Sequence, residues 1–150
     1  MTKANESGQT LVETAISLSI FLLLVLGTID FGYLISTKVT LQNGVRQGGR
    51  YAITGQCITG SDGSCSQTRY NSILQIVENT SLGIAAASEI SITCTGVCPN
   101  GAGGPGDVVT ITVTHPYHYL SGPIGALLHN SITLTVSSAF TNEAFPPSQS

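Results

Sequence analysis

Four cysteines stand in two local pairs, and cysteine side chains can form disulfides or bind zinc. Seven residues separate Cys57 from Cys65, three separate Cys94 from Cys98, and Gly, Ser or Asn residues lie nearby. This placement favours two loop-closing disulfides in an oxidising compartment, although four cysteines allow three connectivities. A four-thiolate zinc site is the alternative, but the two spacings do not give the usual zinc-knuckle pattern in both halves.

The histidines and one glycine-rich stretch carry weaker signals. His115 and His118 flank Pro116, which prevents a helix from holding both side chains on one face, and His129 lies apart from them. Residues 101–106 match G-x-G-x-x-G, but a predicted strand follows, where a dinucleotide site needs a helix N-terminus. We therefore expect a strand connection at this stretch, and neither a metal nor a cofactor.

Composition narrows the classes of function. The five basic residues are scattered and the net charge is −3, so no phosphate-binding stripe can form and nucleic acid is not an expected partner. No serine, cysteine or carboxylate has a sequence context that identifies a nucleophile or a general acid. We expect a protein that is not an enzyme. An envelope hydrolase whose catalytic residues meet only in space is the catalytic alternative.

Glu13 is the remaining residue that could have a chemical role, because it is a lone acid at the start of a long apolar segment. A carboxylate near the membrane boundary is unfavourable unless an opposite charge meets it. Cutting the chain after Gly8 would create such a charge, a free α-amino group on Gln9. Alternatively, Glu13 only marks where a helix leaves the lipid, and the two readings are equally supported by the residues.

The segment after Glu13 predicts a membrane helix. Residues 14–29 carry no charge, and residues 20–26 are apolar on every side of a helix, as in a helix buried in protein or lipid. This run is slightly shorter than the ~20 residues that a spanning helix needs, but helical periodicity can continue through Asp30 to Ile35. A cleaved secretory signal is the alternative, although no small-residue cleavage pattern follows Leu26.

The helix is predicted to continue beyond the membrane, with Arg46 and Arg50 four residues apart on one face. Gly44, Gly48 and Gly49 would each cost such a helix roughly 1 kcal/mol relative to alanine. Close packing against another helix or a sheet would offset this cost, because glycine lets two backbones approach. Gly49 by itself could instead mark a frayed helix end.

The remaining chain predicts a small α+β domain. Residues 68–82 carry apolar side chains at helical spacing. Alternation of apolar and polar residues predicts three strands, at residues 89–95, 109–113 and 132–136. Segments rich in Gly and Pro connect the strands, and the second of these, residues 116–130, has room for one helical turn. The expected fold is a long N-terminal transmembrane helix that continues into an ectodomain with a short helix and a three-stranded antiparallel sheet.

The N-terminal residues resemble the prepilin signature, in which a dedicated peptidase cuts after glycine and a glutamate stands fifth in the mature chain. More narrowly, they are similar to the TadE-like family, pseudopilins of the tight-adherence (Flp, type IV) pilus that begin G-Q-x-x-V-E before a Leu-rich helix. This chain has Gly8-Gln9-Thr10-Leu11-Val12-Glu13. A family pattern similar to N-A-A-R-x-G-A-R-Y-A follows the membrane helix, and residues 43–52, Asn-Gly-Val-Arg-Gln-Gly-Gly-Arg-Tyr-Ala, match it with substitutions.

The resemblance implies assembly rather than catalysis. A minor pseudopilin would sit single-pass in the bacterial inner membrane with its C-terminal domain outside the cytoplasm. The prepilin peptidase would cut between Gly8 and Gln9, and Glu13 would meet the N-terminal amine of a neighbouring subunit. Helix packing would involve Gly44, Arg46, Gly48 and Arg50. The implied partners are other pilin or pseudopilin subunits, the inner-membrane assembly machinery, the peptidase and membrane lipid.

These observations divide the chain into four parts. They are a leader (residues 1–8), a membrane helix with its soluble extension (9–54), an extracytoplasmic pilin-like α+β domain (55–145) and a disordered tail (146–150). The alternative function is a membrane-tethered binding module that is never processed. The Tyr117-His118-Tyr119 segment and the hydroxyl-rich strands motivate that alternative.

Overall fold

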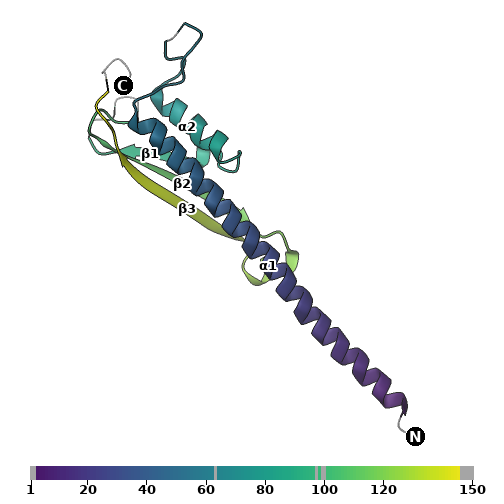
Figure 1. Ribbon diagram of the computed structural model, residues 1–150. Coiled ribbons are helices and arrows are strands. Elements are labelled where there is room, and N and C mark those ends of the chain that lie inside the picture. The colour runs from purple at the N-terminus through teal and green to yellow at the C-terminus, as the bar shows by residue number, and fades with distance from the viewer. Residues whose placement is uncertain (1–2, 63, 97, 99–100, 146–150) are drawn as a thin grey trace. The chain divides into compact units, whose positions relative to one another are not determined.

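The computed structural model describes residues 3–62, 64–96, 98 and 101–145, so the predicted tail lies outside the described residues. The elements follow one another as shown in Figure 1: α1 (Lys3–Ile53), α2 (Arg69–Thr80), the 3-10 turn η1 (Ala87–Glu89), β1 (Ile90–Cys94), β2 (Val108–His118), α3 (Gly122–Leu127) and β3 (Ser131–Thr141). The predicted α+β fold is confirmed, with a long apolar helix, a short helix and a three-stranded antiparallel sheet. The turn η1 was not predicted.

Helix α1 is continuous, and hydroxyl groups of its apolar segment bond to the backbone of the helix itself. The side chains of Thr14, Ser19 and Thr28 each donate a hydrogen bond to the carbonyl four residues earlier, over 2.8 to 2.9 Å. Polar side chains in an apolar segment are thereby satisfied inside the helix itself. By length and composition, the part of α1 from Gly8 to Ile53 could cross a membrane.

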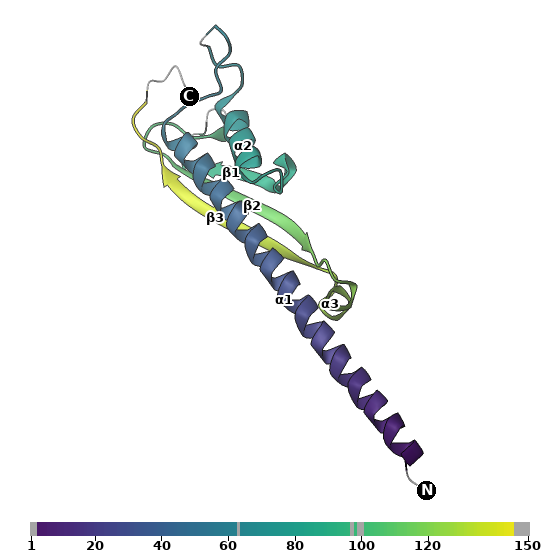
Figure 2. The same ribbon diagram turned by 45° about the vertical axis from the view of Figure 1, so that its right-hand side comes forward.

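The chain forms two compact units. The first joins Met1–Ile35 to Tyr117–Ile132, and the second joins Ser36–Pro116 to Thr133–Ser150. In the second unit, α2 and the sheet lie beside the C-terminal part of α1 (Figures 1 and 2). Its most completely buried apolar side chains are Leu41, Val45, Ala52, Ile73, Val77, Ala85, Ala102, Val109, Ile111 and Val113. The core of the second unit is therefore a helix-on-sheet layer.

The sheet has the strand order β1-β2-β3. Strand β1 pairs antiparallel with β2, from Ile90 opposite Val113 to Cys94 opposite Val109. Strand β2 continues through Pro116, where the sequence predicted a loop, so that boundary of the prediction was wrong. The pairing with β1 stops at Val113, so Pro116 lies where β2 has no β1 neighbour that needs its missing N–H group.

Both disulfides join near neighbours, as the sequence favoured. Cys57 and Cys65 close the loop between α1 and α2, with their Cα atoms 5.6 Å apart. Cys94 and Cys98 close the turn after β1, with their Cα atoms 6.2 Å apart. Since all four thiols are used, the structure gives no support to the alternative zinc site.

Candidate functional site

The residues that carry the predicted processing and assembly roles lie at the surface of the first turns of α1. Gly8 and Gln9 are inside the helix, which already begins at Lys3. A Cβ atom placed on Gly8 would meet nothing within 4 Å. The amide Nε2 of Gln9 donates to Oε1 of Glu13 over 3.3 Å. A carboxylate accepts up to about four hydrogen bonds, so Glu13 keeps the capacity to meet a further donor.

The membrane-helix part of α1 exposes its apolar side chains instead of burying them. Eleven large apolar side chains between residues 11 and 29 are exposed. They are Leu11, Val12, Ile16, Leu18, Ile20, Phe21, Leu22, Leu23, Leu24, Val25 and Ile29. Removing one such side chain from water is worth roughly 1.5 to 3 kcal/mol. This surface therefore needs a cover of lipid or protein.

In the first unit, Asp30 of α1 forms hydrogen bonds with the connection between β2 and β3. Its side chain is 1% exposed. The carboxylate accepts the backbone N–H of Leu120 at 2.8 Å and both the backbone N–H and the hydroxyl of Ser121. The hydroxyl of Tyr117 donates to the Asp30 carbonyl at 3.2 Å. Sequence reasoning treated Asp30 only as a position through which the helix continues, although a lone acid in an apolar run was a signal.

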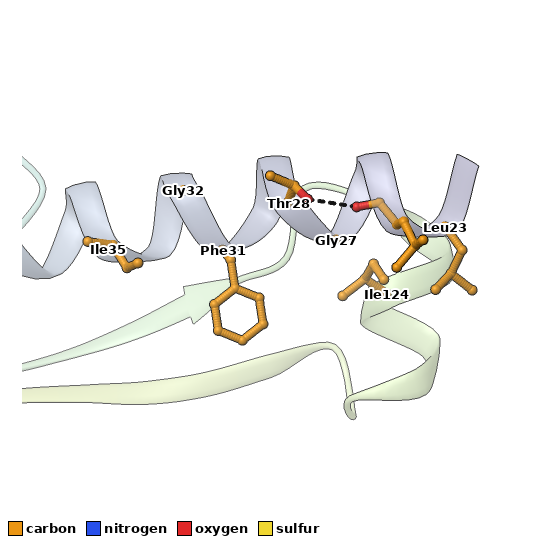
Figure 3. Close-up of a pocket in the computed structure, with 8 residues that line it drawn as sticks. Leu23, Gly27, Thr28, Phe31, Gly32, Ile35 and Ile124 are labelled. Atoms are coloured by element: carbon orange, nitrogen blue, oxygen red, sulfur yellow. Dashed lines mark hydrogen bonds between the residues drawn. The ribbon is translucent and has the colours of Figure 1, made fainter. Parts of the chain in front are cut away.

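An open apolar groove of about 550 Å³ runs along α1 in the first unit. Its lining residues are Leu23, Leu24, Gly27, Thr28, Phe31, Gly32, Ile35 and Ile124. Figure 3 shows Ile124 of α3 beneath Gly27, and a Cβ atom on Gly27 would lie 3.8 Å from Ile124 Cδ1. The Thr28 hydroxyl is bonded to the Leu24 carbonyl, so this groove residue has its donor satisfied.

In the second unit, the glycines of α1 mark close approaches of other elements. A Cβ atom on Gly44 would lie 3.0 Å from Ser81 Cβ and 3.1 Å from the Val77 carbonyl oxygen, and one on Gly48 would collide with the Val77 side chain. A Cβ atom on Gly49 would collide with the Phe140 ring of β3. The glycines thus pack closely against another helix and a strand, as the sequence predicted, and both belong to the same chain. Gly49 is buried, so it does not mark a frayed end.

Arg46 and Arg50 lie at the surface of the same part of α1. Both side chains are exposed on α1. Arg46 lines a small pocket of about 120 Å³ together with Gln42, Val45, Val136, Ser137 and Ser138. The predicted packing role of the two arginines stays a prediction.

Arg69 is the buried cation that sequence reasoning missed. Its side chain is 3% exposed, and it donates to the Ala52 carbonyl at the end of α1 and to the Gly103 carbonyl at 2.5 Å. Its Cζ atom lies 4.4 Å from the centroid of the Phe145 ring. Burial lowers the pKa of the Arg69 guanidinium. A signal existed, because Arg69 begins α2, where the helix dipole disfavours a cation.

His115 and Tyr117 are both engaged with other side chains of the chain. In the second unit, Nδ1 of His115 lies 2.8 Å from Oε2 of Glu89. In the first unit, Tyr117 is buried against Tyr33 and Tyr119, with ring centroids 6.0 and 5.7 Å away. Tyr117 is therefore not available to a ligand, which weakens one motive for a binding module. Within the described residues, no three His, Cys, Asp or Glu side chains form a group that could hold a metal ion.

Comparison with known proteins finds a family match in the N-terminal part of the chain. The family model described as TadE-like protein matches residues 8–50. No curated protein and no solved structure matches the chain. The resemblance seen in the N-terminal residues is thus confirmed over this stretch, and it suggests involvement in the Tad pilus system.

Proposed function

We propose that this protein is a minor, pseudopilin-like structural subunit that takes part in the assembly of a tight-adherence pilus, and that it is not an enzyme. The observation that carries the proposal is α1, which is TadE-like over residues 8–50 and exposes apolar side chains around its N-terminal part. A helix of this kind can be held in lipid and later transferred to a filament of similar helices, because both surroundings cover its apolar surface.

The proposed location is the bacterial inner membrane, crossed once, with the C-terminal part outside the cytoplasm. The long apolar helix supports a membrane anchor. Two disulfides in the second unit support an oxidising compartment for that unit, because cytosolic thiols are normally kept reduced. The leader would lie on the cytoplasmic side, where the prepilin peptidase would reach Gly8 and Gln9.

The proposed role of Glu13 is to meet the N-terminal amine of a neighbouring subunit after processing. Glu13 is exposed, and its hydrogen bond to Gln9 is long, at 3.3 Å. Both features support this role, because a cation can reach the carboxylate and little interaction energy is lost when the bond to Gln9 breaks. In lipid, the attraction between a carboxylate and an ammonium group is much stronger than in water. Such a pair would set the axial position of one helix against the next.

Processing is tested by producing the full chain with and without its cognate prepilin peptidase. We expect the membrane fraction to contain a chain that begins at Gln9 only when the peptidase is active, as measured by intact mass and N-terminal sequencing. A chain that keeps residues 1–8 beside an active peptidase would contradict the pseudopilin proposal.

Assembly is tested with Glu13→Gln, which keeps the shape of the side chain and removes its charge. We expect loss of pilus assembly and of co-purifying pilin subunits, with membrane insertion unchanged. Glu143→Gln is the matched control, because Glu143 is also exposed but belongs to the second unit. Normal assembly by the Glu13 variant would show that this carboxylate has no role in assembly.

A second candidate function, an unprocessed membrane-tethered binding module, is favoured by one face of the sheet. Ser91 and Thr93 of β1 and Thr135 and Ser137 of β3 are exposed, and Thr112 of β2 bonds to Ser137 through the two hydroxyls at 2.9 Å. A sheet face that carries several hydroxyl groups suits a neutral, hydroxyl-rich ligand. Binding of the detergent-solubilised chain to a polysaccharide array, lost on replacing Thr135 with Glu, would support this function over the first.

A further inference from the structure

The β2–β3 connection of the first unit carries an apolar surface of its own. Leu120 is 62% exposed, Leu127 69% and Leu128 40%. Residues 117–132 contain no Asp, Glu, Lys or Arg. Figure 2 shows α3, which belongs to this connection, beside α1. A Cβ atom on Gly27 of α1 would lie 3.8 Å from Ile124 Cδ1 of α3. An exposed cluster of leucines thus adjoins the exposed apolar surface of α1.

The position of Ile124 along α1 sets the depth of this connection in a membrane. A hydrocarbon core of about 30 Å takes about 20 helical residues. A span that starts at Thr14, directly after Glu13, would end near Tyr33. Gly27 would then lie about 9 Å inside the boundary at 1.5 Å per residue. Helices that lie in the membrane interface bury their apolar face by about 5 to 10 Å.

Asp30 gives an independent reason to place the connection at this depth. The same span would put Asp30 inside the hydrocarbon, where an uncovered carboxylate is strongly disfavoured. The Leu120 and Ser121 groups cover it and donate hydrogen bonds to it. These donors must enter the membrane together with Asp30. Because Asp30 is covered, residues 14–37 have no exposed charged side chain. These residues correspond to about 36 Å of helix.

We propose that residues 120–128 form a second membrane contact, in which Leu120, Leu127 and Leu128 enter the boundary between lipid headgroups and acyl chains. An acyl chain would fill the groove between α1 and Ile124. This inference rests on the membrane anchoring proposed above and adds a lipid-binding role for the β2–β3 connection. The chain would therefore contact the membrane through a spanning helix and through an interfacial segment that is hydrogen-bonded to that helix.

Lipid is the occupant that the surface favours over a second protein. The leucines and the exposed apolar surface of α1 have no exposed charge between them, and the groove is lined mostly by apolar atoms. Tyr33 is exposed beside this surface, and tyrosine is enriched at the level of the lipid headgroups. A protein interface of similar size would normally add charged or amide groups at its rim.

Depth-dependent fluorescence quenching tests the proposal, because the chain contains no tryptophan. Single reporters are introduced by Leu127→Trp and, separately, by Leu120→Trp, both at exposed positions where a larger side chain has space. The Phe21→Trp variant reports on the spanning segment, and Ser91→Trp reports on the sheet of the second unit. Each full-length variant is reconstituted in phosphatidylethanolamine and phosphatidylglycerol vesicles that contain lipids brominated near the headgroup or deep in the acyl chain.

We expect the Leu127 and Leu120 reporters to lose most of their fluorescence to the shallow brominated lipid. The Phe21 reporter should be quenched by the deep one, and the Ser91 reporter by aqueous acrylamide alone. If the Phe21 reporter is quenched by lipid while the Leu127 and Leu120 reporters respond only to acrylamide, the membrane anchor is supported and the proposed second membrane contact is wrong. Reporters at Leu127 and Leu120 that no quencher reaches would show a protein cover and overturn the proposal. A Phe21 reporter insensitive to lipid would remove the anchor itself.

Discussion

The two parts of α1 meet different surroundings although they belong to one helix. Residues 8–25 are exposed all round the helix, whereas the part from Ser36 onward buries a single stripe that includes Leu41, Val45 and Ala52. The second part also uses glycines to let α2 and β3 approach. The comparison teaches that overall apolarity marks the segment meant for lipid, while a one-sided stripe with small residues marks the segment packed on its own domain.

The largest expected effect comes from charging the lipid-facing part. Phe21→Asp removes an apolar side chain and adds a carboxylate near the centre of the span, which should disfavour insertion by about 3 to 4 kcal/mol. The fraction of chain that resists carbonate extraction from membranes measures it. Gln47→Asp, an exposed position in the second part, should leave that fraction unchanged. If both variants resisted extraction to the same extent, the two parts of α1 would not differ in their contact with lipid.

The next largest effect concerns the buried cation of the second unit. Arg69→Met leaves the carbonyls of Ala52 and Gly103 without their donor, and we expect the free energy of unfolding to fall by about 2 to 4 kcal/mol. Thermal unfolding of the detergent-solubilised chain, followed by near-ultraviolet circular dichroism, measures the change. Arg50→Met, on the exposed surface of α1, should change it by less than about 0.5 kcal/mol. Comparable losses would mean that burial does not set the importance of Arg69.

A pair of glycine substitutions compares the two parts directly. Gly49→Leu should destabilise the fold by about 1 to 3 kcal/mol, because its side chain would collide with the Phe140 ring. Gly32→Leu should be tolerated, since a Cβ atom there meets nothing within 4 Å. The same unfolding measurement serves both variants. A stable Gly49→Leu protein would argue against the close approach of β3 to α1.

The smallest effect is expected at the start of α2. The Thr68 side chain accepts a hydrogen bond from the Asn71 N–H at 3.3 Å, so Thr68→Ala should cost roughly 1 kcal/mol of unfolding free energy. Thr68→Ser keeps the hydroxyl and should recover most of the loss. Membrane extraction should not change in either variant, because α2 belongs to the second unit. A serine variant as unstable as the alanine one would exclude the cap as the cause.

Local patterns explain why much of the fold could be predicted. Helical and strand periodicities are properties of neighbouring residues, so α2 and β1 were found within two residues of their observed bounds. Helix α1 and strand β3 were found too, but α1 already begins at Lys3, inside the predicted leader, and β3 continues to Thr141, beyond the predicted end at residue 136. The cysteine pairs were likewise near neighbours. The end of β2 at His118, beyond Pro116, was missed, because the effect of a proline in a strand depends on which neighbouring strand is present.

By itself, the sequence determined that the chain has one apolar helix, a small α+β domain and a TadE-like N-terminal stretch, since each depends on composition or short-range order. Only the tertiary structure decided what Asp30 and Arg69 do. The donor from Leu120 to Asp30 comes from 90 residues away, and the Gly103 acceptor of Arg69 from 34 residues away. A lone charge in a sequence shows that a partner is needed, but the folded chain alone supplies that partner.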